Sequence, residues 1–267
     1  MTLSRDQMLA EMGITPLWRL REPCAELAVE ALGPESAENR AEAAAVVGQE
    51  IAPSPAVKAP TAVVVQGGRE DGIAGLDWDG LRAGVAACRA CVLCEHRKQA
   101  VLGVGDLRPD WLFVGEGPGA DEDVQGEPFV GQAGKLLDAM LAALGLRRGD
   151  KVYIGNAVKC RPPGNRTPEA QEMAACKPFL DRQIDLLQPK IIVLLGRAAV
   201  HSVLDSDKSL AAMRGQRFDY RGIPVVVTYH PAYLLRNLPE KAKAWEDLLF
   251  ARRTLREGLA ASAQLPL

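Results

Sequence analysis

The chain has 267 residues, of which 48% are hydrophobic and 25% charged, values typical of a folded globular protein of one or two domains. It lacks an apolar run long enough to span a membrane and starts without the pattern of a secretory signal, so we expect a cytoplasmic protein. In a reducing compartment its six cysteines are better explained as thiols or metal ligands than as disulfides. The net charge of −2 by itself gives no indication of a nucleic-acid ligand.

The first 75 residues differ in composition from the rest of the chain. Residues 1–21 place apolar side chains near helical spacing and predict an amphipathic N-terminal helix. Residues 22–75 are rich in glutamate, alanine and proline and predict a flexible, disordered linker. A tethered helix of this kind suggests a partner that the sequence does not identify. Because the linker holds an excess of acidic residues, the remaining chain is mildly basic.

Residues 76–258 alternate apolar runs with segments of helical periodicity, and residues 259–267 form a tail. Strands apolar on both faces are predicted at 111–114, 152–154, 191–195 and 224–228. Helices are predicted at 134–144, 168–187 and 239–255, the second with Thr167 as N-cap. This order predicts an α/β fold with a central, mostly parallel four-stranded sheet flanked by helices in three layers.

Each predicted strand is followed by glycine or by a polar residue able to act on a ligand. These strand exits carry Glu116 in a glycine-rich turn, Asn156, Arg197 after a glycine, and His230. Because parallel strands end at the same edge of a sheet, these residues are expected to line one crevice. A buried carboxylate is costly unless it is used or paired, so Glu116 favours a functional site, and His230 suits a donor to a developing anion.

Three further features have both a structural and a functional interpretation. The Asn156 amide either ties two loops together or reads the adjacent N3 donor and O4 acceptor of uracil. Phe129 lies in a loop and is either a core side chain or a platform for a flat ring. The loop 161–166 carries Arg161 and Arg166 among prolines and glycine, which fits either a solvated surface or a phosphate contact.

The cysteines favour a metal site. Cys88-x2-Cys91 has a chelating spacing shared by zinc and iron–sulfur sites, and Cys160 and Cys176 follow with 15 residues between them. A metal there would pin the segment before the first strand onto the loop after the second. Spacing does not choose iron over zinc, and it leaves one of Cys91 and Cys94 surplus.

Taken in order, these motifs resemble the family 4, iron–sulfur uracil-DNA glycosylases. The matching pieces are Cys88-x2-Cys91, the 115–119 turn with Glu122-Asp123, residues 128–131, 156–163 with Asn165-Arg166, Cys176, and 229–233. The resemblance covers about two thirds of the chain. It implies a uracil-DNA glycosylase-like domain and a base excision repair enzyme that flips uracil out of DNA. Such an enzyme hydrolyses the N-glycosidic bond and leaves an abasic site.

The resemblance also implies roles for individual residues. It implies a [4Fe-4S] cluster on Cys88, Cys91, Cys160 and Cys176, with Cys24 and Cys94 unassigned. Glu116 and His230 are expected to be catalytic, and the base is expected to contact Gly117, Glu122, Phe129 and Asn156, with Glu122 excluding the thymine methyl group. DNA contacts are expected from Arg161, Asn165, Arg166, Tyr233, Leu234, Leu235 and Arg236. We expect a monomer that acts on uracil-containing DNA.

Other functions remain open at the level of sequence. One is a related glycosylase that acts on hypoxanthine or xanthine, and others are a non-catalytic iron–sulfur nucleic-acid-binding protein and an electron-transfer protein. Glu116 and His230 at strand exits would be needless in a non-catalytic binding protein, and an electron-transfer protein would leave the motif-rich crevice unexplained. A related X-type group captures uracil covalently through a histidine in a basic insertion, but residues 158–164 contain no histidine, so turnover is expected.

Overall fold

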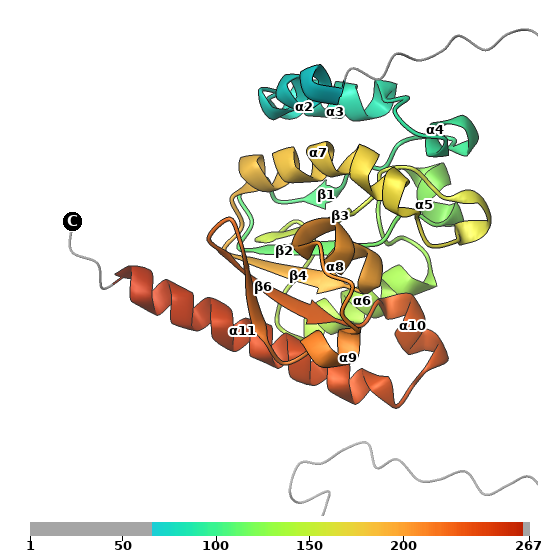
Figure 1. Cartoon of the computed structure of the whole chain (residues 1–267). Coiled ribbons are helices and arrows are strands. Elements are labelled where there is room, and N and C mark those ends of the chain that lie inside the picture. The colour runs from blue at the N-terminus through green and yellow to red at the C-terminus, as the bar shows by residue number, and fades with distance from the viewer. Residues whose placement is uncertain (1–65, 264–267) are drawn as a thin grey trace, which may run out of the picture. The chain divides into compact units, whose positions relative to one another are not determined.

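The computed structural model describes residues 66–263 (Figure 1). The predicted helix at 1–21, most of the predicted linker with Cys24, and the last four residues of the tail lie outside the described residues. Within residues 66–263, every helix is too short or too polar to cross a membrane.

A six-stranded sheet forms the centre of the described part of the chain. Its strands are β1 (Val104–Gly105), β2 (Trp111–Gly115), β3 (Val152–Asn156), β4 (Ile191–Leu195), β5 (Arg217–Tyr220) and β6 (Ile223–Thr228). The order across the sheet is β1-β3-β2-β4-β6-β5. The four central strands are parallel, and β1 and β5 pair antiparallel at the two edges.

The four predicted strands are confirmed as the parallel centre, but the predicted number of strands is wrong because both edges were missed. β1 has only two residues, too few for an apolar pattern. β5 reads Arg-Phe-Asp-Tyr and alternates exposed with half-buried positions. An edge strand needs only one hydrogen-bonded neighbour and one packed face, so it lacks the continuous apolar run of a central strand.

Helices cover both faces of the sheet. They are α2 (Gln66–Ala74), α3 (Trp78–Ala87), α4 (Leu93–His96), α5 (Ala120–Gln125), α6 (Gln132–Ala143), the 3-10 turn η1 (Pro163–Asn165), α7 (Ala170–Leu187), α8 (Arg197–Leu204), α9 (Leu210–Met213), α10 (Pro231–Arg236) and α11 (Glu240–Ala263). Alternate strand residues point to opposite faces. Phe113 and Val193 pack with α6 and α11, whereas Leu112 and Leu194 pack with α7 and α8. The predicted three-layer α/β architecture is therefore confirmed.

The folded region is longer at both ends than the sequence predicts. Residues 66–74 fall in the predicted linker but form α2, which packs with α3 on the outer side of α7 (Figure 1). Ile73 is buried there, and Arg69 donates to the carbonyl of Ala175 at 2.9 Å. α11 continues to Ala263, past the predicted domain end at residue 258. These polar helices depend on packing against α7 and the sheet, which composition alone does not reveal.

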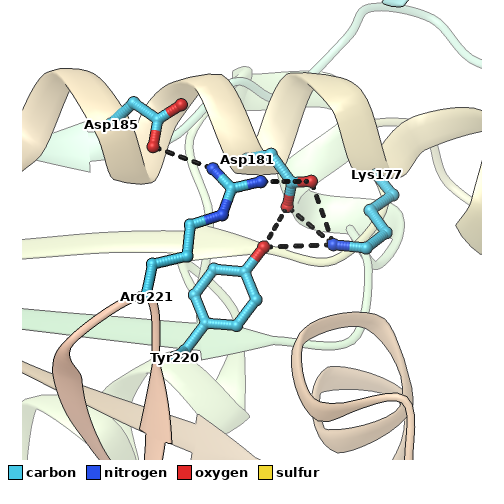
Figure 2. A network of polar contacts seen from close by, with 5 residues as sticks. All are labelled: Lys177, Asp181, Asp185, Tyr220 and Arg221. Atoms are coloured by element: carbon cyan, nitrogen blue, oxygen red, sulfur yellow. Dashed lines mark hydrogen bonds and ion pairs between the residues drawn. The ribbon is translucent and has the colours of Figure 1, made fainter.

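A polar network holds the β5–β6 hairpin against α7 (Figure 2). Arg221 in the turn donates to Asp185 at 2.8 Å and to Asp181 at 3.2 Å. Lys177 and the Tyr220 hydroxyl also donate to Asp181, at 2.8 and 2.7 Å. The turn precedes β6, so the network lies at the amino ends of the parallel strands, away from their ligand-binding edge.

Candidate active site

A cavity of about 730 Å³ opens where the parallel strands end. Glu116 follows β2, Asn156 ends β3, Arg197 follows β4 after a glycine, and His230 follows β6. All four line this cavity. The parallel topology thus brings together the four strand exits, which are far apart in the sequence.

Most residues with a predicted role in base or DNA contact line the same cavity. They are Glu116, Gly117, Glu122, Phe129, Asn156, Asn165, Arg166, His230, Tyr233 and Arg236. Arg161, Leu234 and Leu235 do not line it. Leu234 is 1% exposed, because it lies on the inner face of α10, so its predicted contact with DNA is not available in this structure. Leu235 and Leu238 are exposed on the outer side of the same segment.

Asn156 lies at the buried end of the cavity. Its side chain is 2% exposed, yet the amide oxygen Oδ1 has no hydrogen-bond partner among residues 66–263. A buried acceptor without a partner is costly and requires an explanation, such as a ligand that donates to it. Gly115 makes room for the amide, since a Cβ at that position would lie 2.5 Å from both Asn156 Oδ1 and the Phe129 ring.

Phe129 is held beside Asn156 by a strained loop. Its φ of 56° lies in the left-handed region, and its ring centroid lies 5.4 Å from that of His230. The Phe129 carbonyl accepts hydrogen bonds from Arg148 Nη2 at 2.5 Å, and a Cβ on Gly134 would overlap the same oxygen. No role in the site was predicted for Gly134 or Arg148 from the sequence. Strain of this kind at a ligand site costs of the order of 1–3 kcal/mol and persists because such contacts hold it.

His230 is the N-cap of α10, and its ring is neutral. Nδ1 accepts a hydrogen bond from the backbone N–H of Ala232 at 3.2 Å. The pKa of His230 is lowered to about 4, mainly by burial and also by the charge of Arg236, while Glu122 partly opposes the shift. With Nδ1 as acceptor, the single ring proton sits on Nε2. The imidazole is therefore a neutral donor.

Glu116 and the residue predicted to cap α7 contact each other. Burial raises the pKa of Glu116, and a hydrogen bond from Thr167 partly opposes the rise. Thr167 was predicted as the N-cap of the helix, but the structure begins α7 at Ala170 with Glu169 as cap. The Thr167 hydroxyl thus orients a carboxylate in the cavity.

The Glu122 carboxylate joins the two loops that frame the cavity. Oε2 accepts from the N–H of Gly119 at 2.9 Å, and Oε1 accepts from Val130 at 2.9 Å and Gly131 at 3.1 Å. Among residues 117–119 this leaves the N–H of Gly117 for a ligand, because Pro118 has none. Exclusion of a methyl group by Glu122 stays a prediction.

Both arginines of the 161–166 loop already have side-chain partners. Arg166 makes a two-pronged ion pair with buried Glu172, at 2.8 and 2.6 Å, and this pair lowers the pKa of Glu172. Arg161 donates to Asn165 Oδ1 at 2.7 Å. By contrast, the exposed side chains of Arg197 and Arg236 line the cavity and make no hydrogen bond or ion pair within the described residues.

The cysteines gather in a second, small cavity between α3, α4 and α7. Cys88, Cys91, Cys94, Cys160 and Cys176 all line it, and all are free thiols. Three donors point at sulfur atoms: Arg97 Nη1 to Cys160 at 2.9 Å, Arg69 Nη2 to Cys88 at 3.5 Å, and the N–H of Lys159 to Cys176 at 3.3 Å. Burial raises the pKa of Cys91 and Cys160, and that of Cys176 to about 12.

The thiols are not arranged around one ion. Among the described residues, no three His, Cys, Asp or Glu side chains are placed to hold a single metal ion. A multi-iron cluster attaches each cysteine to a different iron, so its ligands stand further apart than those of one ion. The shared cavity, the donors to sulfur and the two guanidinium groups fit anionic thiolates of such a group.

Several known proteins are similar in sequence to this chain. The family model of the Uracil DNA glycosylase superfamily matches residues 102–249. A Type-4 uracil-DNA glycosylase of Thermotoga maritima is 50% identical over 155 residues, which are 57% of this chain and 80% of that protein. One of Sulfurisphaera tokodaii is 46% identical over 172 residues, 61% of this chain and 77% of that protein. One of Pyrobaculum aerophilum is 41% identical over 181 residues, which are 65% of this chain and 92% of that protein.

The family model spans the β2–β6 sheet and its cavity. The fold, the cavity and these matches agree with the sequence motifs. The chain belongs to the uracil-DNA glycosylase superfamily and, within it, to the Type-4 uracil-DNA glycosylases.

Proposed function

We propose that this protein repairs DNA by binding flipped-out uracil in the 730 Å³ cavity and hydrolysing its N-glycosidic bond, which leaves an abasic site. The observation that supports this proposal best is the buried, unpartnered amide oxygen of Asn156 beside the Phe129 ring. A flat base that donates a proton would satisfy it.

The Asn156 amide selects uracil by hydrogen bonding. Its oxygen accepts from N3–H of uracil and its NH2 group donates to O4. Cytosine presents a lone pair at N3 and an amino group at C4, so both contacts would oppose it. A site that hydrogen-bonds one group of a substrate rejects an analogue without that group, because the buried polar atoms of the site would be left unpaired. Phe129 stacks on the ring.

The base reaches this amide only after leaving the double helix. Flipping costs a few kcal/mol, which contacts elsewhere must offset. Leu235 on the exposed side of α10 enters the vacated space as an apolar wedge, next to Tyr233. Arg197 and Arg236, which have no ion-pair partner within the described residues, contact the flanking phosphates.

Bond cleavage places negative charge on the departing uracil and positive charge on the sugar. The neutral His230 donates from Nε2–H to O2 of uracil, helped by the N–H of Gly117. A neutral donor stabilises the anion without protonating the base beforehand. Glu116, held by Thr167, positions the attacking water and offsets the positive sugar.

Cys88, Cys91, Cys160 and Cys176 would hold a [4Fe-4S] cluster. Support comes from their convergence in one small cavity and from the donors aimed at their sulfur atoms. When bound, the cluster supplies a cross-link between the segment before β1, the loop after β3 and α7. That loop starts directly after Asn156.

We further propose a monomer that acts on uracil-containing DNA. The free thiols support a reducing compartment such as the cytoplasm.

The test uses oligonucleotides that contain uracil, thymine or hypoxanthine at one position, followed by alkaline cleavage of abasic sites. We expect cleavage at uracil only, and a fall of about a hundredfold or more in His230→Ala. His201→Ala is the matched control, since His201 lies on α8 outside the cavity and pairs with Asp207. Preferred cleavage at hypoxanthine would favour the broader-specificity alternative, and equal activity of both histidine variants would refute the assigned site.

A further inference from the structure

Lys159 lines the cysteine cavity and contacts Asn156, and its side chain has no role in either of the two sites described above. Its side chain is 1% exposed. The ammonium Nζ donates to the backbone carbonyl of Asn156 at 2.8 Å, and the backbone N–H of Lys159 donates to Cys176 Sγ at 3.3 Å. One residue therefore contacts both the base-reading residue and a proposed cluster ligand.

A buried ammonium needs compensation. A charged group taken out of water costs far more than a neutral one unless it is paired. Within the described residues, no carboxylate bonds Lys159, and its ammonium donates to the carbonyl of Asn156. The hydrogen bond to Asn156 is thus the contact that holds this buried cation, and the backbone of the same residue is tied to Cys176.

The bond from Lys159 acts on the last peptide of β3. Asn156 pairs with Gly115 at the end of the β2–β3 ladder, where regular sheet pairing stops. Its carbonyl fixes the plane of the following peptide and hence the direction in which the chain leaves the strand. Hydrogen bonds from charged donors are stronger than neutral ones, so Lys159 restrains this peptide firmly. A small rotation here would move the amide that faces uracil.

We propose that Lys159 is a positioning residue that holds Asn156 in its uracil-reading orientation and couples the cysteine site to the base pocket. This inference rests on the proposed role of Asn156. Lys159 touches neither the base nor the sugar in this scheme.

The test is a double-mutant cycle with Lys159→Met and Asn156→Ala, since methionine keeps the length and the apolar stem of lysine. For the intact protein we would measure iron per chain, inhibition by free uracil, and excision per iron-loaded molecule. We expect Lys159→Met to keep its iron and to weaken inhibition by uracil about tenfold or more, the effect of losing a charge-assisted hydrogen bond. In a protein that already carries Asn156→Ala, the Lys159→Met substitution should change uracil inhibition and excision by less than about twofold. The effects of two residues that act through one another are not additive.

Lys177→Met is the control, since Lys177 is a partly buried lysine in the network of Figure 2 that bonds Asp181 and Tyr220. Its effects should be small and should add to those of Asn156→Ala. The proposal would be overturned if the effects of Lys159→Met and Asn156→Ala on uracil inhibition and excision added in full. It would also be overturned if Lys159→Met lost activity only in proportion to its loss of iron. If Asn156→Ala alone left uracil inhibition unchanged, the role of Asn156 would fail first, and the coupling with it.

Discussion

The neutral state of His230 leads to a prediction about pH. A pKa lowered from 6.5 to about 4 favours the uncharged ring by about 3 kcal/mol. At pH 7 only about one molecule in a thousand would carry the imidazolium. Protonation also places a hydrogen on Nδ1, which then cannot accept from Ala232. Excision should therefore show no inflection from His230 between about pH 5 and pH 8.

The same shift affects stability, and its sign follows from proton binding. The unfolded histidine binds a proton near pH 6.5, whereas the folded one binds it only near pH 4. The contribution of His230 is thus fully present above pH 6.5 and is lost as the pH falls toward 4. Between about pH 7 and pH 5, the free energy of unfolding of the wild type should fall by about 2 kcal/mol more than that of His230→Ala.

The direct assay is an NMR titration of the imidazole signals. The chain has three histidines, and the signal that disappears in His230→Ala identifies this one. We expect a midpoint near pH 4 and a shift pattern of the Nε2–H tautomer. A midpoint near 6.5, or the Nδ1–H tautomer, would refute the argument that a neutral Nε2–H donor stabilises the departing base.

Three further outcomes are expected. Cys88→Ala should lower iron content and unfolding stability together, whereas Cys94→Ala should keep its iron; iron loss at unchanged stability would contradict a structural cluster. Gly115→Ala should fold but should excise uracil far more slowly, because its Cβ would lie 2.5 Å from the Asn156 amide oxygen and from the Phe129 ring. Normal kinetics with an unchanged circular dichroism spectrum would show that the pocket tolerates a methyl group. Leu235→Ala should slow excision from duplex DNA more than from single strands, because only the duplex needs a wedge, and equal slowing on both substrates would remove that role.

The parallel centre of the fold was predictable because its strands are buried on both faces. A strand buried on both faces needs apolar side chains at every position, so a continuous apolar run such as 191–195 is visible in the sequence alone. Asn156 and His230 stood out for a related reason, since polar residues directly after such runs lie at the ligand-binding edge. β1 was missed because it has only two residues, and β5 and α2 were missed because their residues are largely polar and are ordered by packing against other elements.

The sequence does not show which face of a helix a side chain near the site occupies, or which distant residues it contacts. Leu234 and Leu235 are adjacent leucines, and only the orientation of α10 buries the first and exposes the second. Arg166 looks like a free basic residue in the sequence, but it pairs with buried Glu172. Arg148 carries no local signal at all, because its task is to bond a carbonyl in a loop 19 residues away.

The amino-acid sequence by itself determined the α/β class, the strand exits, the cysteine spacing and the resemblance to an iron–sulfur glycosylase family, because each depends on local pattern and residue chemistry. The tertiary structure alone decided that the Asn156 oxygen lacks a partner in the described part of the chain, that Glu122 accepts from three backbone N–H groups, and that Lys159 is buried between two sites. Burial and hydrogen-bond partners are set by segments that meet only in the folded chain, and no periodicity in the sequence records them.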